Sequence, residues 1–239
     1  MTLLASWAAI DTHGISSAYI VSDSRISWEN KKYFDFGKKV FASKKYPEIF
    51  GYAGDVLFPS IVLSQIIDMI DTDVLFDESM TCSKKNKIVF EKLQYSFSKY
   101  PDVYGDNPIQ IIHISRDTMV DKYPNFHHYL LTWNRKYGWS KEEKVFPIKS
   151  GILNVLGSGK EEFKKEVQAA YDAGTVAYSI GYNVDMLSVA PKAALTSATN
   201  IWAAYYTYAF GQLLKGEDID IDWAKGYSDD AVAITALGE

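Results

Sequence analysis

Apolar and β-branched residues recur in short runs through the first part of the chain, a pattern typical of β-strands. Residues 2–10 and 17–23 are two such runs, and the turn between them contains Gly14, which predicts a β-hairpin. Residues 23–28 alternate polar and apolar side chains, so they are expected to extend the second strand or bend it toward a neighbour. Two further short strands are predicted at residues 39–42 and 48–52.

The spacing of the apolar residues then becomes helical. Helices are predicted over residues 56–70 and 80–100. Pro59 falls in the first turn of the first helix, where a missing N–H is tolerated. Pro101 and Gly105 are expected to end the second helix.

The second half of the chain repeats this order of strands followed by helices. Strands are predicted at residues 108–115, 129–133, 144–148, 152–156 and 231–237. Amphipathic residues 161–173 predict a helix, and a second, rich in alanine and aromatic residues, is expected over about 191–214.

Segregated runs of strands and helices favour an α+β fold over a doubly wound parallel sheet. Two helix pairs that cover two antiparallel sheets would form a four-layer αββα sandwich. No internal repeat or linker divides the sequence, so a single domain over residues 1–239 is expected.

Composition agrees with a large buried core, since 47% of the 239 residues are hydrophobic and 15% are aromatic. The net charge is -5, which argues against an electrostatic nucleic-acid binder. The basic cluster at residues 84–87 is interpreted as solvated helix surface. The N-terminus lacks a basic signal-peptide region, and no apolar run is long enough to span a membrane, so a soluble, cytoplasmic protein is expected.

Cysteine and histidine give little sign of metal chemistry. The single cysteine, Cys82, excludes an intramolecular disulfide and a zinc cluster, and is interpreted as a structural or incidental thiol. His127 and His128 precede a predicted strand, where neighbouring side chains point to opposite faces, so joint ligation by this pair is not expected. We expect no metal and no cofactor.

Common catalytic motifs are absent, including a serine-hydrolase elbow, a zinc-protease helix and a dinucleotide loop. Residues 157–160 (Gly-Ser-Gly-Lys) open a predicted helix, where backbone amides can bind phosphate. The stretch lacks the upstream glycine and the following Ser or Thr of a phosphate loop, so this is the weaker hypothesis.

Thr2 is the most informative candidate. Methionine aminopeptidase removes Met1 when the next side chain is small, which would leave a free N-terminal threonine. Its α-amine would titrate near ~8, low enough to act as a base toward its own hydroxyl at neutral pH. Many chains begin Met-Thr without catalytic purpose, so Thr2 alone carries little weight.

Further motifs resemble those of proteasome β-subunits and HslV-type peptidases, which are N-terminal-nucleophile (Ntn) hydrolases. In family order they are residues 21–25 (Val-Ser-Asp-Ser-Arg), 38–41 (Lys-Lys-Val-Phe), 50–55 (Phe-Gly-Tyr-Ala-Gly-Asp) and 155–159 (Val-Leu-Gly-Ser-Gly). Each motif is weak alone. They lie in family order together with Thr2, and the succession of strands and helices agrees with the family across nearly the whole chain.

The resemblance implies a role for each matching residue. Thr2 is the nucleophile, Lys39 lowers the pKa values of the site, and Asp23 keeps Lys39 oriented and charged. The catalytic set is completed by Ser158, near the threonine amine.

The resemblance also implies two substrate contacts. Gly54 supplies an oxyanion N–H, and Ser27 lies where substrate pairs as an added strand.

Each feature also has an ordinary explanation. Asp23 with Arg25 is compatible with a surface ion pair, Lys38 and Lys39 with the flank of an edge strand, and Gly54 with a turn before a helix.

The family's late Asp, two residues ahead of a Ser-Gly, has no clear match. Ser228 suits the serine, but Lys225 stands where the Asp is expected, and the alternative Asp185 with Ser188 precedes the last predicted helix. These departures indicate a divergent branch.

The sequence therefore predicts a threonine-type amide hydrolase, a proteasome-like threonine protease acting on peptide or protein substrates. By resemblance it would assemble as a homo-oligomeric ring, with any ATPase partner unspecified. The alternatives are a non-catalytic ring or scaffold subunit with the same fold, and an Ntn amidase acting on a small amide.

Overall fold

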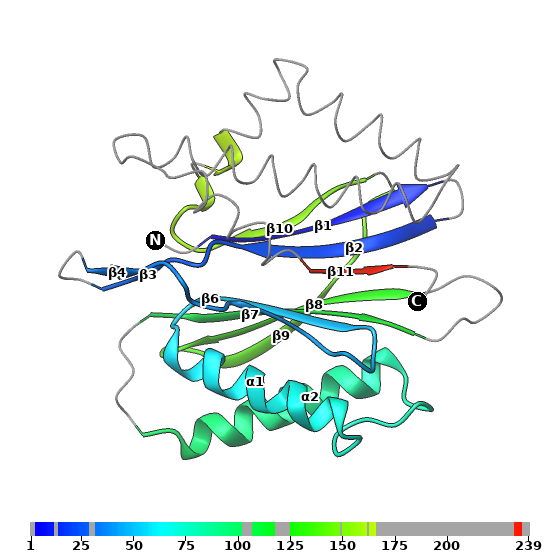
Figure 1. Cartoon of the computed structure of the whole chain (residues 1–239), viewed down its shortest axis with the longest axis horizontal. Coiled ribbons are helices and arrows are strands. Elements are labelled where there is room, and N and C mark those ends of the chain that lie inside the picture. The colour runs from blue at the N-terminus through cyan, green and yellow to red at the C-terminus, as the bar shows by residue number, and fades with distance from the viewer. Residues whose placement is uncertain are drawn as a thin grey trace.

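Two antiparallel sheets face each other, and two helices cover the outer face of one of them (Figure 1). The computed structural model describes residues 3–11, 14–28, 32–101, 107–117, 125–148, 150–161, 163–165 and 232–235. Within these ranges the chain is a mixed α+β protein, as the segregated pattern predicts.

The first sheet has the strand order β10-β1-β2-β11. Its strands are β1 (Leu4–Asp11), β2 (Gly14–Ser22), β10 (Gly151–Leu156) and β11 (Val232–Thr235). The predicted N-terminal hairpin is confirmed, because Asp11 pairs with Gly14 across the turn. Gly14 has a φ of 121°, a conformation that favours glycine.

The second sheet has the order β5-β6-β7-β8-β9. Its strands are β5 (Val40–Ala42), β6 (Glu48–Gly54), β7 (Ile109–Arg116), β8 (Phe126–Asn134) and β9 (Gly138–Lys144). The predicted strand at 144–148 is wrong, because β9 ends at Lys144, and Val145 and Ile148 are 92% and 94% exposed. The β9 sequence (Gly-Trp-Ser-Lys-Glu-Glu-Lys) is that of a polar edge strand, so hydrophobic periodicity does not mark it.

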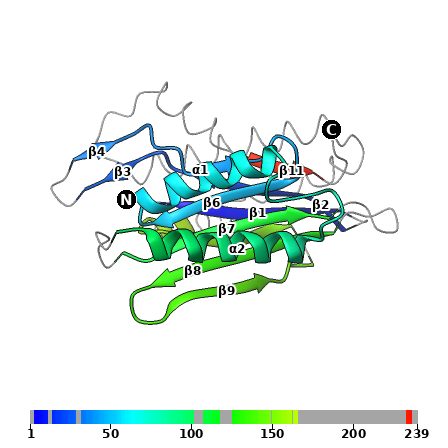
Figure 2. The same ribbon diagram turned by 90° about the horizontal axis from the view of Figure 1, so that it is seen from below.

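Residues 23–28 bend away from β2 and do not extend it. After Asp23 the chain forms β3 (Ile26–Ser27), which pairs with β4 (Tyr33–Phe34) in a small separate hairpin. This hairpin projects from one end of the sheets (Figures 1 and 2).

Helices α1 (Leu57–Asp71) and α2 (Cys82–Lys99) lie side by side across the second sheet (Figure 2). Asp55 Oδ1 accepts a hydrogen bond from the Phe58 N–H at the start of α1 (3.1 Å), and Pro59 lies in that first turn, as predicted. The Thr81 hydroxyl accepts from the Lys84 N–H at the start of α2. The interpretation of residues 84–87 as solvated surface is wrong for Lys85 and Asn86, which are buried.

Two hydrophobic clusters bind the layers together. One joins α1 and α2 to the second sheet through residues such as Phe58, Leu63, Leu93 and Leu131. The other lies between the sheets and includes Leu4, Ile20, Ile49 and Ile112.

Gly51 allows the close approach of the sheets. A Cβ at this position would lie 2.7 Å from side-chain carbons of both Leu4 and Ile20. Any larger residue would therefore push β6 away from β1 and β2.

The fourth layer of the predicted sandwich stays a prediction. Helical backbone follows Gly159 at residues 160–161 and 163–165, and the predicted helix at 191–214 lies outside the described residues. Across the described ranges, neither helix has the length and apolar character needed to cross a membrane.

A polar contact also joins the two sheets. His128 on β8 is buried, and its Nε2 lies 2.9 Å from the Ser6 hydroxyl on β1. His127 is directed to the opposite face, as strand alternation predicts. Burial lowers the pKa of His128 to about 4, so the buried ring is neutral at pH 7.

This buried histidine predicts a pH-dependent stability. Between its ordinary pKa of 6.5 and about 4, the unfolded chain protonates His128 and the folded chain does not. Stability is therefore lost as pH falls through this window, by up to about 1.4 kcal/mol per pH unit. Urea unfolding at several pH values should show a shallower loss of stability in His128→Leu than in wild type. Equal slopes in wild type and His128→Leu would contradict this assignment.

Candidate active site

A buried ion pair forms where β2 ends. Lys39 Nζ donates to Asp23 Oδ1 at 2.9 Å, and both side chains are fully inaccessible to solvent. The same ammonium donates to the backbone carbonyl oxygen of Arg25. Two groups in the segment between β2 and β3 therefore hold the Lys39 ammonium: the Asp23 carboxylate and the Arg25 carbonyl.

The Asp23 carboxylate also holds the beginning of the chain. The Leu3 N–H donates to Asp23 Oδ1 at 2.7 Å, and the Asp23 N–H donates to the Leu3 carbonyl at 3.1 Å. These bonds extend the β1–β2 pairing by one residue beyond Leu4 and Ser22. The Leu3 N–H and the Lys39 ammonium therefore converge on one carboxylate oxygen.

Two opposing effects act on the Asp23 carboxyl. Burial raises its pKa, and the Lys39 charge and the Leu3 hydrogen bond counteract that rise. Asp23 Oδ2 is also buried and accepts no hydrogen bond within the described part of the chain. A buried oxygen without a hydrogen-bond partner is costly and rare in folded proteins, and a catalytic role is one explanation for it.

The explanation of Asp23 and Arg25 as an ordinary surface ion pair is wrong, because both residues are buried. The Arg25 guanidinium bonds Asp35 at 2.6 Å and stacks over the Tyr33 ring at 4.3 Å. Of the two lysines before β5, Lys38 is exposed and Lys39 is buried. Only Lys38 behaves as the surface flank of an edge strand.

Gly54 ends β6 in a conformation that requires glycine. Its φ is 94°, and a Cβ there would lie 1.8 Å from the Pro108 carbonyl oxygen. Tyr52, two residues earlier, donates its N–H toward Lys39 O at 3.1 Å, so strand alternation directs the Gly54 N–H to the same edge of β6. Since Asp55 Oδ1 accepts from the Phe58 N–H in the first turn of α1, Gly54 also serves the turn before that helix.

A cleft of about 440 Å³ brings three of the predicted residues together. Its lining includes Ser27 of β3, Gly54 of β6 and Ser158 of the turn after β10. Further lining comes from the segment before and at the start of β7, including Pro108 and Gln110. Asp23 and Lys39 are not part of this lining.

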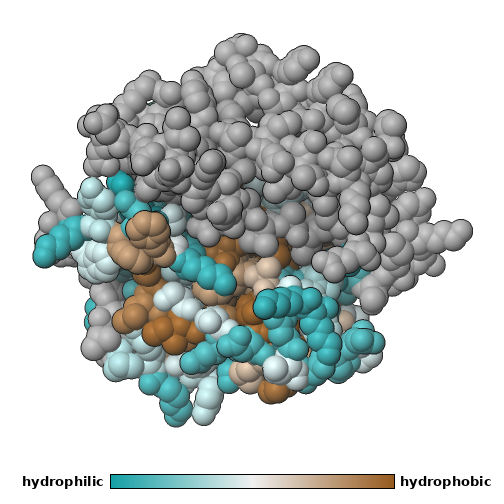
Figure 3. Space-filling model, in the orientation of Figure 1, coloured by the Kyte–Doolittle hydropathy of each residue, from teal (hydrophilic) through white to brown (hydrophobic). Residues whose placement is uncertain are grey.

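Exposed aromatic residues lie beside Ser27. Trp28, Tyr33 and Phe34 are at least half exposed, and Phe36 is 81% exposed. Hydrophobic residues are visible at the left of Figure 3, the side on which the β3–β4 hairpin projects in Figure 1. The hairpin thus presents apolar rings next to a cleft-lining residue.

Several residues that the sequence predicts for the active site are not among the described residues. Thr2 lies outside the described residues, as do Ser188, Lys225 and Ser228. Sequence reasoning missed Leu3 and the Arg25 carbonyl as partners of the ion pair, and Pro108 and Gln110 as cleft residues. Backbone groups leave no signature in the sequence, and Pro108 reaches Gly54 only through the β6–β7 pairing.

Comparisons with known proteins find similar structures only. No protein-family profile and no curated protein match the chain. Eukaryotic HslV from Trypanosoma brucei has a TM-score of 0.38 and 13% identity, with 84% of this chain and 91% of that chain covered. Anbu from Yersinia bercovieri has a TM-score of 0.44 and 12% identity, covering 79% and 76%. The helical Anbu assembly from Pseudomonas aeruginosa has 0.43 and 11%, covering 77% and 75%. All three scores lie below 0.5, a level at which a shared function does not follow.

The buried pair makes a sharp prediction about stability. Lys39→Met leaves the Asp23 carboxylate buried without its cation, and should lower the free energy of unfolding by about 3–5 kcal/mol. The matched control Lys38→Met alters an exposed neighbour and should cost less than about 1 kcal/mol.

A double variant separates charge from packing. In Lys39→Met with Asp23→Asn, the neutral amide oxygen still accepts from the Leu3 N–H, so much of the lost stability should return. Urea unfolding measures all four proteins. Equal stability of Lys39→Met and Lys38→Met would contradict the buried pair.

Proposed function

We propose that this chain is a threonine-type N-terminal-nucleophile amide hydrolase, with Thr2 as nucleophile once Met1 is removed. The observation that carries the proposal is the junction of Leu3, Asp23 and Lys39. The Leu3 nitrogen belongs to the peptide bond that joins residues 2 and 3, and it shares Asp23 Oδ1 with the Lys39 ammonium. The buried Lys39–Asp23 pair therefore lies next to the peptide bond that would follow an N-terminal threonine at position 2.

The chemistry needs a hydroxyl, a base and a positive charge. The α-amine of Thr2 takes the proton of its own hydroxyl, directly or through water, and the threonine oxygen attacks the carbonyl carbon of the amide. The amine then delivers the proton to the leaving nitrogen, and an ester remains on Thr2. Water hydrolyses the ester and regenerates the threonine. Lys39 favours the hydroxyl's deprotonated form through its charge, and Asp23 keeps that charge in place.

The cleft supplies the remaining roles in the proposal. The Gly54 N–H stabilises the oxyanion, Ser158 assists at the threonine amine, and Ser27 pairs with the substrate backbone. Three segments that line one cleft, each with a predicted residue, support a peptide as the substrate. A single domain over residues 1–239 and a homo-oligomeric ring belong to the same proposal.

Hydrolysis of a panel of fluorogenic peptides by the full chain tests the proposal. Thr2→Ala should reduce kcat/KM by roughly 10³-fold or more, because it removes the nucleophile. Thr2→Ser should retain measurable activity, since serine keeps a hydroxyl beside the α-amine. Thr72→Ala, at an exposed threonine after α1, is the control and should match wild type.

Three results would decide between the proposal and its alternatives. Wild-type activity in folded Thr2→Ala would overturn the proposal. A folded protein that retains Met1 and hydrolyses neither peptides nor small amides would also overturn it, and would favour the non-catalytic subunit. Cleavage of small amides alone, still lost in Thr2→Ala, would keep the nucleophile and replace the peptide substrate.

A further inference from the structure

A second group of reactive side chains lies at the far end of the same strands. Gly54 pairs with Ile109 at the cleft end of β7, and Glu48 pairs with Ser115 at the other end. Six residues of strand separate these positions, or about 20 Å at ~3.3 Å per residue. The far group is therefore distinct from the candidate active site.

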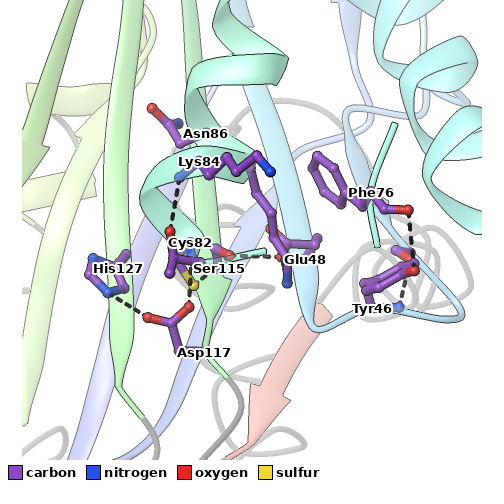
Figure 4. Close-up of polar contacts among 12 residues, drawn as sticks. Tyr46, Glu48, Phe76, Cys82, Lys84, Asn86, Ser115, Asp117 and His127 are labelled. Carbon is purple, nitrogen blue, oxygen red and sulfur yellow. Dashed lines mark hydrogen bonds and ion pairs between the residues drawn. The ribbon is translucent and has the colours of Figure 1, made fainter. Parts of the chain in front are cut away.

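Three potential metal ligands meet there (Figure 4). Cys82 is the first residue of α2, Asp117 follows β7, and His127 lies on β8. One ligand atom from each lies within 4.8 Å of the other two. His127 Nε2 and Asp117 Oδ2 are 3.3 Å apart, which matches the edge of a tetrahedral zinc site with bonds of about 2.0–2.1 Å.

We propose that Cys82, Asp117 and His127 bind one Zn²⁺ ion, with water as a further ligand. Sulfur, nitrogen and oxygen together suit zinc better than magnesium or calcium, which prefer oxygen alone. A thiolate and a carboxylate would neutralise the two charges of the ion. We expected no metal from the sequence because one cysteine cannot form a cysteine cluster, but a mixed site needs only one.

Each ligand is already held by an outer partner, as in metal sites generally. Glu143 Oε1 lies 2.7 Å from His127 Nδ1, and the Cys82 N–H donates to Asp117 Oδ1 at 2.6 Å. The Ser115 hydroxyl lies 2.9 Å from Cys82 Sγ. His127 Nε2 then faces Asp117 Oδ2 at 3.3 Å, and one ligand atom of each of the three residues lies within 4.8 Å of the others.

The hydrogen bonds of His127 indicate the tautomer that a metal requires. When Glu143 accepts the Nδ1 proton, Nε2 carries the lone pair, and the Asn125 amide donates to it at 3.0 Å. Without a metal the Asn125 amide satisfies this lone pair, so zinc binding requires the Asn125 side chain to turn away from Nε2. The rival arrangement is a doubly protonated His127 that donates to both Glu143 and Asp117 without any metal.

A metal ion can reach the three side chains from solvent, and binding would displace the Cys82 thiol proton. Asp117 and His127 are each 20% exposed, so an ion can enter from their side, although Cys82 is buried. Burial raises the pKa of the Cys82 thiol, which opposes the thiolate, so the charge of the cation has to compensate for this cost. Binding converts thiol and Zn²⁺ to a zinc thiolate and releases the proton to water.

Cobalt provides the direct test, because the chain has one cysteine. Titration of the full-length protein with Co²⁺ should produce a near-ultraviolet thiolate-to-cobalt charge-transfer band that saturates at one equivalent, and Zn²⁺ should abolish it. Cys82→Ser should lose the band. A folded wild-type protein, judged by circular dichroism, that gives no band would overturn the proposal.

Zinc affinity, measured by competition with a chromophoric chelator, tests the other ligands. His127→Gln, at a partly exposed position, should bind at least about 100-fold more weakly, and Glu143→Gln about 10-fold or more. Glu142→Gln is the matched control, because its neighbouring side chain bonds Lys144 and should leave affinity unchanged. Wild-type zinc affinity in folded His127→Gln would favour the metal-free histidine and contradict the site. None of these readouts depends on hydrolysis.

Discussion

The ion pair between Lys39 and Asp23 is the contact on which the candidate active site depends. A fully buried ammonium and carboxylate are costly to desolvate, and they persist only when geometry and hydrogen bonds compensate. Here the Leu3 N–H and the Arg25 carbonyl supply those bonds. The first residue of the described chain and the bend after β2 are thereby tied to one charge pair. Apolar side chains at these two positions would avoid the desolvation cost of the buried charges.

Two ends of the same strands carry different chemistry. At one end of β6 and β7, Gly54 and Pro108 approach so closely that only glycine fits, and the cleft opens there. At the other end, Glu48 is buried with Ser115, His113 and Lys85 in a polar network that borders Cys82. The hydrophobic clusters above and below this sheet hold both ends in fixed register.

The parts of the fold that the sequence predicts are those with strong local signals. Helices α1 and α2 and the apolar strands followed from hydrophobic spacing, because each buries one face or both. The polar edge strand β9 and the two-residue strands β3 and β4 lack that signal. The candidate site divides in the same way: motif order suggested Asp23, Lys39, Gly54 and Ser158, whose roles stay predictions, whereas Leu3 and Pro108 contribute backbone atoms. Asp117 and His127 meet through the β7–β8 register, and Cys82 joins them at the start of α2; local sequence patterns specify neither.

We propose above that the Lys39–Asp23 ion pair, which also binds the Leu3 N–H, serves a nucleophile at residue 2. The most direct test treats the full-length protein with a peptide epoxyketone or vinyl sulfone and maps the adduct by tandem mass spectrometry. An N-terminal threonine at position 2 that carries the inhibitor, with much slower labelling in Lys39→Met with Asp23→Asn than in Lys38→Met, is the predicted result. An adduct on Cys82 or Ser158, or an unmodified Thr2 in a protein that hydrolyses peptides, would contradict the claim.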